Sequence, residues 1–189
     1  MKTQDLIKIK TQKTQLSIAS FFKKRFSPRV FSQDEIPDKD LEIIFEAARW
    51  TPSSYNRQPW YFYVAKKGTI GFEKLSSTLL QGNDWAKESP VLILACFIEK
   101  DNYGENFYAQ YDLGQAVASL VYQAQILGYY SHQMAGFDKE KAKKFVSKDH
   151  TPWVMIALGK IGDYEKAPEK ILEMDSKKPE RKEKIFHIF

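Results

Sequence analysis

Apolar residues recur at two spacings along the chain, and these spacings separate the expected helices from the expected strands. A period of three to four residues is typical of a helix that buries one face. This pattern predicts helices over residues 15–25, 38–49, 70–80, 107–130 and 138–146. Asp38 suits the N-cap of the second helix, after Pro37. Gly128 suits the position just after the C-cap of the long helix.

Three segments rich in β-branched and aromatic residues predict strands, at 60–66, 91–98 and 153–161. The middle segment, VLILACFI, is a continuous apolar run, which predicts a strand buried on both faces. Residues 130–135 are expected to form a short strand or a loop. Because Gly-x-Gly-x-x-Gly and the phosphate-loop pattern are both absent, a doubly wound dinucleotide fold is not indicated.

Composition narrows the class of protein. A chain of 189 residues with 43% apolar and 28% charged residues is typical of one globular domain. The longest apolar run is too short to cross a bilayer. The basic N-terminus has no continuous apolar stretch and does not resemble a secretory signal. We therefore expect a cytoplasmic protein that does not associate with membranes.

Charge and cysteine content exclude further classes. The single cysteine, Cys96, rules out an internal disulfide and a cysteine-based zinc site, and we expect it in the core. We expect no metal site. The net charge is +5, but most basic residues are scattered or interleaved with acidic ones, which is typical of a solvated face. We therefore expect no nucleic-acid partner.

The two ends of the chain differ from its middle. Residues 1–14 are expected to form a basic extension, and residues 15–189 a single domain. The last 28 residues are highly charged but end in the apolar stretch KIFHIF, which has no local partner in sequence. This ending suggests docking on another surface, such as a second subunit.

One polar stretch, RFSPR at residues 25–29, places two arginines and a serine at the end of an expected helix. Pro28 disfavours helix at Ser27 and stiffens the turn. Arginine holds phosphate through permanently charged, bidentate donors. Taken alone, the same residues could simply complement the dipole of their own helix.

A second polar stretch, TPSSYNRQPW at residues 51–60, gathers hydroxyl, amide and guanidinium groups between two prolines. Amides offer a donor and an acceptor together, which suits a polyol chain or the edge of a heterocycle. Taken alone, the stretch could also be an ordinary polar loop. The two stretches together combine anion binding with recognition of a polar edge.

At these two stretches the sequence resembles the nitroreductase family of FMN-dependent oxidoreductases. The family signature is an Arg-x-Ser-x-Arg/Lys-x-Phe turn, a helix ending in Ala, and then Pro-Ser-Ser-x-Asn-x-Gln-Pro-Trp. Here these motifs read RFSPRVF and AARWTPSSYNRQPW. The resemblance continues in GNDWAKESPVLI, in YDLGQAVASLVYQAQILGYYSHQMAGFD and in PWVMIALGKIG, and covers roughly residues 17–189.

The resemblance implies a cofactor site at both motifs. Arg25 would hold the FMN phosphate, with Phe26 and Ser27 in the same turn. Arg29 would lie along the ribityl chain and the pyrimidine edge, where its charge stabilises the negative charge of the reduced flavin near N1 and O2. Five loop residues would line the cofactor, with the serines reaching the flavin of the partner subunit: Pro52, Ser53, Ser54, Asn56 and Gln58.

Two later segments would complete the site. The stretch Gln133, Met134, Ala135, Gly136 would pass beside the flavin ring, with a backbone N–H near Ala135 or Gly136 facing N5. Glycine suits such a close approach of the backbone. Arg181 aligns with a tail arginine of the family that contacts phosphate, and Lys178 and Lys182 are weaker candidates.

Three departures from the family pattern are visible. Many members carry a glutamate at the position of Ala135. Some members use an asparagine and a lysine before the central strand, and Gln81, Asn83 and Lys87 all lie near that position without fixing the register. The long insertion that builds a substrate lid in larger members is absent, so the acceptor is not defined.

The fold implied is an α+β, nitroreductase-like sandwich with a small mixed sheet flanked by helices. The resemblance also implies an intertwined homodimer, with helix 107–130 in its interface and two FMN molecules at that interface. The C-terminal tail would cross to the other subunit and add its end to that sheet. This tail exchange agrees with the unpartnered KIFHIF.

The activity implied is hydride transfer from NAD(P)H through FMN to a nitroaromatic, quinone or enone-type acceptor, by a ping-pong mechanism. No catalytic side chain is expected, because flavin N5 carries the chemistry. Tyr103, Phe107 and Tyr108 could stack on flat acceptors, or they could be aromatic residues of the dimer core. His132 could line the substrate cleft, or it could be structural. Neither NADH nor NADPH is favoured.

Alternative functions remain open. Other flavin chemistry occurs on the same fold, such as dehalogenation or flavin breakdown, and a binding protein could keep FMN without turnover. A basic regulator of nucleic acid is a third class, which salt-dependent DNA binding would reveal.

Overall fold

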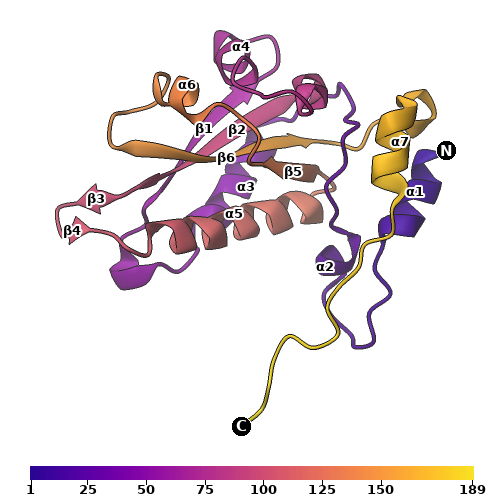
Figure 1. Ribbon diagram of the computed structural model, residues 1–189, viewed down its shortest axis with the longest axis horizontal. Coiled ribbons are helices and arrows are strands. Elements are labelled where there is room, and N and C mark those ends of the chain that lie inside the picture. Colours follow the sequence, from indigo (N-terminus) through magenta and orange to yellow (C-terminus); the bar gives the residue numbers. More distant parts are fainter.

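The computed structural model describes all residues, Met1–Phe189, and shows an α+β sandwich (Figure 1). The strands are β1 (Trp60–Lys66), β2 (Val91–Ile98), β3 (Lys100–Asp101), β4 (Gly104–Glu105), β5 (Tyr130–Met134) and β6 (His150–Gly159). The helices are α1 (Thr3–Lys10), α2 (Ser20–Lys24), α3 (Asp38–Arg49), α4 (Ile70–Ser76), α5 (Ala109–Ile126), α6 (Lys139–Lys143) and α7 (Glu169–Ser176). Three short 3-10 helices complete the chain: η1 (Ser54–Asn56), η2 (Asp84–Glu88) and η3 (Tyr164–Lys166).

The main sheet has four strands in the order β1-β2-β6-β5. All three pairings are antiparallel, so within this chain the sheet is not mixed as expected. The long strands β2 and β6 form the centre, and β1 and β5 form the edges. A separate two-stranded hairpin, β3–β4, extends beyond β2.

Side chains that alternate along β2 fill two cores, one on each face of the sheet. Val91, Ile93, Ala95 and Phe97 join the first core, beneath α3 and α5. The intervening residues of β2 join the second core, on the face that α4 and α6 cover. This alternation confirms that the apolar run 91–98 is a strand buried on both faces.

The expected strands 60–66 and 91–98 and the expected helix 38–49 are confirmed with the same bounds. Residues 130–134 form an edge strand, and the strand expected at 153–161 is His150–Gly159. Gly128 has φ +86° just after the C-cap of α5, as predicted. Asp38 is the first residue of α3 rather than its N-cap, and it forms an ion pair with Lys66.

The other expected helices are shorter in the structure. The predicted ranges 15–25, 70–80, 107–130 and 138–146 become Ser20–Lys24, Ile70–Ser76, Ala109–Ile126 and Lys139–Lys143. Leu16, which supported an early start of the first helix, is 79% exposed, so no burial favours helix there. After α4 the chain leaves the helix, and Leu79 forms a β-bridge with Phe137.

The N-terminal segment contains a helix that the sequence pattern did not predict. α1 packs beside α7 at the β5 end of the sheet (Figure 1). Leu6 is fully buried in the second core, although residues 1–14 were expected to lie outside the domain. The domain boundary at residue 14 stays a prediction, but α1 contributes to the core.

The C-terminal segment after α7 leaves the body of the protein (Figure 1). Its apolar side chains Ile185, Phe186, Ile188 and Phe189 are all at least 71% exposed. The chain itself therefore offers no partner for KIFHIF. No helix is long and apolar enough to cross a membrane.

Cys96 lies on β2 and has no exposed surface. Burial raises the pKa of its thiol to about 12. The expectation that Cys96 belongs to the core is confirmed.

Candidate functional site

The turn that follows α2 presents its polar residues on one side and buries the others. Phe26 is 6% exposed and packs edge-on against Tyr130, with ring centroids 5.0 Å apart. Pro28 is also buried. These two residues anchor the turn from behind, and Arg25, Ser27 and Arg29 remain partly accessible.

Arg25 is partly buried and has no acidic partner. Its side chain makes a single hydrogen bond, from Nη1 to Ser27 Oγ at 3.4 Å, and it forms no ion pair. Burial lowers the pKa of Arg25, and the positive charge of Arg181 lowers it further. An arginine that is partly desolvated beside a second arginine has the charge and the free donors to hold an anion.

Arg29 is held from one side only. Its Nη1 pairs with a carboxylate oxygen of Asp175, which lies on α7 and is 2% exposed. No other N–H of this guanidinium donates to a protein group, although an arginine has five. The unpaired donors leave one edge of Arg29 free to bind a ligand.

The end of β5 supplies backbone donors. The N–H groups of Ala135 and Gly136 donate to no other backbone group and to no side chain. The carbonyl of Gly136 is occupied, because it accepts from Leu80 N at 3.1 Å and from Asn83 Nδ2 at 2.8 Å. Next to them Met134 is buried and Gln133 is exposed.

Of the three polar residues before β2, Asn83 is the one that lies at this strand end. A Cβ added at Gly136 would come 2.5 Å from Asn83 Nδ2, so the two residues are in close contact. Lys87 instead pairs with Asp84 on the surface at 2.7 Å. Gln81 is exposed to solvent. The structure thus selects Asn83 as the candidate beside Gly136.

His132 packs behind the turn. Its Nδ1 lies 3.0 Å from the carbonyl oxygen of Pro28, which can only accept, so Nδ1 carries the proton. Its ring lies 4.5 Å from the ring of Trp85. Burial lowers the pKa of His132 to about 4, so the ring is neutral near pH 7. These contacts are structural, and a role of His132 toward the acceptor stays a prediction.

The polar loop 51–58 has a strained backbone. Tyr55, Asn56 and Gln58 all have positive φ, at 52°, 55° and 47°. Such angles are uncommon for residues other than glycine and persist where surrounding contacts fix them. Here Ser53 Oγ accepts from Gln58 N at 3.0 Å, and Ser54 N donates to Asp112 on α5 at 3.1 Å.

Arg57 clamps this loop to the β3–β4 hairpin. Its guanidinium donates to both carboxylate oxygens of Asp101, at 2.8 and 2.6 Å. It also donates to the carbonyls of Gly104 and Glu105, at 2.6 and 3.0 Å. Four of its donors are therefore satisfied within the chain, and Arg57 is a structural residue of the loop.

The three predicted acceptor-contacting aromatics lie near this loop and are exposed. Tyr103, in the hairpin turn, is 86% exposed, and Phe107 and Tyr108, before α5, are 87% and 60% exposed. They do not meet His132 within one chain. Their predicted contact with an acceptor therefore stays a prediction.

The two halves of the predicted site lie at opposite ends of α5 (Figure 1). The loop contacts Asp112 in the first turn of α5, whereas Phe21 and Phe22 of α2 pack on Tyr122 near its end. A helix of 18 residues is about 27 Å long. One chain therefore does not bring the loop 51–58 to the turn 25–29.

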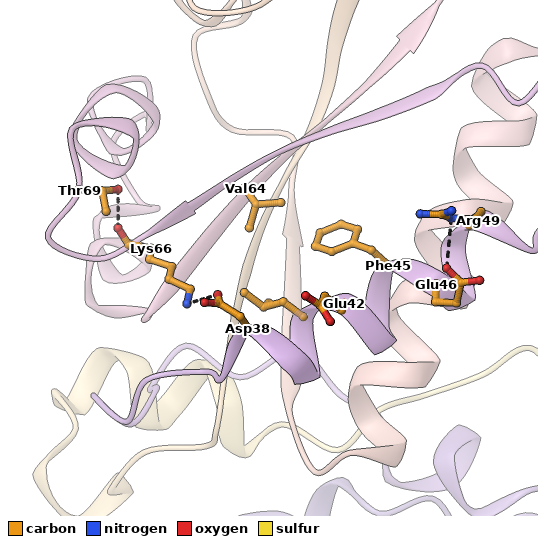
Figure 2. A pocket seen from close by; sticks show the side chains of 9 residues that line it. Asp38, Glu42, Phe45, Glu46, Arg49, Val64, Lys66 and Thr69 are labelled. Atoms are coloured by element: carbon orange, nitrogen blue, oxygen red, sulfur yellow. Dashed lines mark hydrogen bonds and ion pairs between the residues drawn. The ribbon is translucent and has the colours of Figure 1, made fainter.

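A groove runs along the edge strand β1, between that strand and α3 (Figure 2). Its volume is about 610 Å³. Phe45 and Val64 point into it, and the Lys66–Asp38 ion pair lies at one end. The outer backbone edge of β1 has no neighbouring strand.

Sequence patterns missed several residues of this region. Asp175 and Tyr164 lie more than 130 residues from Arg29 in sequence, and both accept a hydrogen bond from its backbone N–H. Trp85, whose buried Nε1 has no partner, packs on His132. No sequence signal distinguished Asp175, because α7 carries other acidic residues that stay on the surface.

Comparison with known proteins is consistent with this geometry. A model of the nitroreductase family matches residues 22–83, which include both polar motifs. An uncharacterized 15.4 kDa protein of Mycolicibacterium smegmatis is 40% identical over 111 residues, covering 58% of this chain and 76% of that protein. An oxygen-insensitive NADPH nitroreductase of Helicobacter pylori is 28% identical over 145 residues, covering 72% of this chain and 63% of that protein.

A solved structure extends the match to the whole fold. The crystal structure of an oxidoreductase containing FMN has a TM-score of 0.81 and 29% sequence identity, and the match covers 88% of each chain. This structural match includes helices and strands well beyond residues 22–83, which the family model matches. With both signature motifs in place on this fold, the chain belongs to the nitroreductase family.

Proposed function

We propose that this protein is an FMN-dependent oxidoreductase that passes hydride from NAD(P)H through FMN to a nitroaromatic, quinone or enone-type acceptor, by a ping-pong mechanism. The observation that carries the proposal is the unpaired, partly buried Arg25 beside Arg181. A partly buried cation without an acidic partner favours binding of an anion, and the phosphate of FMN supplies one.

The residues present fit FMN. Arg25, Ser27 and Arg181 would hold the phosphate, and the free edge of Arg29 would face the pyrimidine. The unpaired N–H groups of Ala135 and Gly136 would face N5, and the absence of a side chain at Gly136 lets Asn83 pack closely against this strand end. A structural relative contains FMN and a sequence relative is an NADPH nitroreductase, which supports the same cofactor and co-substrate here.

When bound, FMN would supply the redox chemistry of hydride transfer. The chain supplies placement and charge. Arg29 stabilises the negative charge that reduction places near N1 and O2. Neutral His132 and partly buried Trp85 hold the turn that carries Arg29.

The same proposal includes a homodimer, because one chain separates the two halves of the site. The loop residues Pro52, Ser53, Ser54, Asn56 and Gln58 of one copy would face the flavin of the other. The exposed aromatics Tyr103, Phe107 and Tyr108 then lie at the subunit boundary, where they can contact either the acceptor or the second chain.

We assign the β1 groove to the C-terminal tail of the second copy. Residues 177–189 can reach up to about 45 Å when extended. Their end is apolar and unpartnered, and the groove offers Phe45, Val64 and an open strand edge. A strand added at that edge would satisfy the free backbone groups of β1.

The activity is tested on purified protein under anaerobic conditions. Bound FMN should give an oxidised flavin spectrum that bleaches on addition of NADPH or NADH and recovers when a quinone or nitroaromatic is added. Protein that stays colourless with excess FMN would overturn the proposal. Flavin that binds but is not reduced by either nucleotide would indicate an FMN-binding protein instead.

The dimer is tested separately, by light scattering. Phe186→Asp together with Ile188→Asp should convert a dimer of about 44 kDa, twice the 22.0 kDa chain, into a monomer. The matched change Lys178→Asp, before the apolar end, should leave the dimer intact. A double variant that remains dimeric would exclude tail exchange as the main link.

A further inference from the structure

A buried carboxylate stands directly behind Arg29. Asp175 is 2% exposed and accepts three hydrogen bonds. Arg29 donates twice, through Nη1 and through its backbone N–H at 2.9 Å. The third donor is the hydroxyl of Tyr164, at 2.5 Å. Asp175 therefore fixes both the main chain and the side chain of Arg29.

Tyr164 supports this carboxylate and is itself locked in place. Its side chain has no exposed surface. Burial and the hydrogen bond to Asp175 raise the pKa of Tyr164 well above its usual range, so the phenol remains a donor. Its oxygen also lies 3.2 Å from the backbone N of Arg29.

The helix α1 contacts Tyr164 directly and also contacts the end of α7, the helix that carries Asp175. Thr3 Oγ1 accepts from the backbone N–H of Tyr164 and donates to the carbonyl of Gly162, each at 3.0 Å. At the other end of α1, Lys10 Nζ donates to the carbonyl of Lys177 at 2.6 Å, one residue beyond α7. Leu6 is fully buried between these contacts, and α1 and α7 lie side by side (Figure 1).

Lys10 is also electrostatically close to the pair. Burial lowers the pKa of Lys10, the charge of Asp175 raises it, and the charge of Arg29 lowers it. Asp175 forms its ion pair with Arg29, and Lys10 donates instead to the carbonyl of Lys177. The basic N-terminal segment, for which the family motifs give no role, is thereby tied to the turn that carries Arg29.

We propose that α1 and α7 form a brace in which Asp175 is a positioning residue: it holds Arg29 in place and limits the positive charge that Arg29 presents to the flavin. This inference rests on the proposed FMN site. A weaker positive charge stabilises the anionic reduced flavin less. Asp175 should therefore hold the midpoint potential of the flavin below the value that Arg29 alone would set.

The test is the variant Asp175→Asn, which keeps a hydrogen-bond acceptor but removes the charge. We expect its affinity for reduced FMN, relative to oxidised FMN, to rise about tenfold, which is a shift of about +30 mV for a two-electron couple. The potential is measured by anaerobic titration against a reference dye. The matched control is Asp34→Asn, which removes an exposed carboxylate paired with Lys160 and should leave the potential unchanged.

A second variant separates position from charge. Asp175→Glu keeps the charge on a longer side chain that displaces Arg29. We expect the dissociation constant for FMN, measured by flavin fluorescence, to rise roughly fivefold, while the potential stays closer to that of the native protein than to that of Asp175→Asn. Unchanged FMN affinity in this variant would contradict the positioning role.

The contribution of α1 is tested in the full chain by Leu6→Ala. Ile44→Ala on α3 is the matched control, since both side chains are fully buried but Ile44 lies in the other core. At a similar loss of thermal stability, FMN affinity should fall at least threefold more in Leu6→Ala. Equal losses of affinity would overturn the role of α1.

The outcomes separate this inference from the proposed function. Native protein that takes up no FMN would overturn the proposed function. Native protein that binds FMN, with a potential that Asp175→Asn leaves unchanged or lowers, would overturn the brace alone.

Discussion

Two arginine–aspartate pairs at opposite ends of the molecule use the same chemistry differently. In the pair Arg57–Asp101, four guanidinium donors of Arg57 bind acceptors in the β3–β4 hairpin, and the side chain of Asp101 is 30% exposed. In the pair Arg29–Asp175, one guanidinium donor is used and the aspartate is buried at 2%. Arg57 thus uses its guanidinium donors within the chain, whereas Arg29 is fixed by one of them and keeps the others unpaired.

The difference separates an arginine whose donors the chain itself satisfies from one that keeps donors for a ligand. The hydrogen bond between Arg57 and Asp101 raises the pKa of Arg57 and lowers that of Asp101, as expected for a closed structural pair. Burial instead lowers the pKa of Arg25, which has no carboxylate partner. We call the region of Arg25, Arg29 and Gly136 the basic end, and the region of residues 51–58 with the β3–β4 hairpin the loop end.

The largest effect is expected from Arg25→Ala at the basic end. Loss of two charge-assisted hydrogen bonds to phosphate, at about 1.5–3 kcal/mol each, should weaken FMN binding about a hundredfold or more. Flavin fluorescence titration measures this change. Arg49→Ala, which removes an exposed arginine paired with Glu46, is the control and should change affinity less than twofold. Equal losses of FMN affinity in the two variants would contradict the distinction between an arginine without an acidic partner and one that is paired within the chain.

The next largest effect is the pH dependence of stability that arises from His132, a neutral ring that packs against the turn 25–29. Its pKa is about 4 in the folded protein against an ordinary value of 6.5, so the unfolded chain binds more protons between these values. Its contribution to stability is complete above pH 6.5 and is lost as the pH falls toward 4, by up to about 3 kcal/mol.

Urea unfolding between pH 4.5 and 7 measures this slope. His132→Gln should flatten it, whereas His187→Gln in the exposed tail should leave it as in the native protein. A slope that is unaffected by His132→Gln would mean that the ring is not held neutral.

A smaller effect is expected from Gly136→Ala, also at the basic end. The added methyl group would displace Asn83 from its contact with the Gly136 carbonyl and crowd the backbone donors. We expect FMN affinity to fall about tenfold, on the order of one lost hydrogen bond to a charged or polar group. Gly71→Ala, where the new methyl makes only ordinary contacts, is the control. Full FMN affinity in Gly136→Ala would place the flavin away from this strand end.

The smallest effect on the cofactor is expected at the loop end. Arg57→Ala should accelerate amide exchange in the β3–β4 hairpin by roughly tenfold, because its donors hold the hairpin to the loop. FMN affinity should fall only about threefold, through the loosened loop. A loss as large as that of Arg25→Ala would show that Arg57 contacts the cofactor directly, which its satisfied donors argue against.

The sequence pattern predicted the central elements well because their apolar periodicity is matched by burial. β1, β2 and α3 have the bounds expected, since each contributes apolar side chains to the first core. α1 could not be predicted, because Leu6 is its only fully buried residue and its partners lie near residue 170. Leu16 had the opposite effect. Its helical spacing predicted an earlier helix start, but nothing in the chain covers its side chain.

Site residues could be proposed from the sequence only where a local motif carries them. The turn 25–29 and the loop 51–58 are contiguous motifs, and both were identified by their residue types. The choice of Asn83 over Gln81 and Lys87 depended on its contact with Gly136, 53 residues away. Asp175 lies 146 residues from Arg29, and no local pattern links them. Pairs of this kind follow from the packing of α7 rather than from spacing.

The burial of Cys96 has a practical consequence for electrochemistry. A thiol with a pKa of about 12 contains almost no thiolate at neutral pH, and its position in the middle of β2 keeps oxidants and alkylating reagents away. As the chain has no second cysteine, thiol–disulfide couples within one molecule cannot contribute to a measured current or absorbance change. Reducing equivalents counted in a titration of intact protein can therefore be assigned to the prosthetic group without correction for sulfhydryl oxidation.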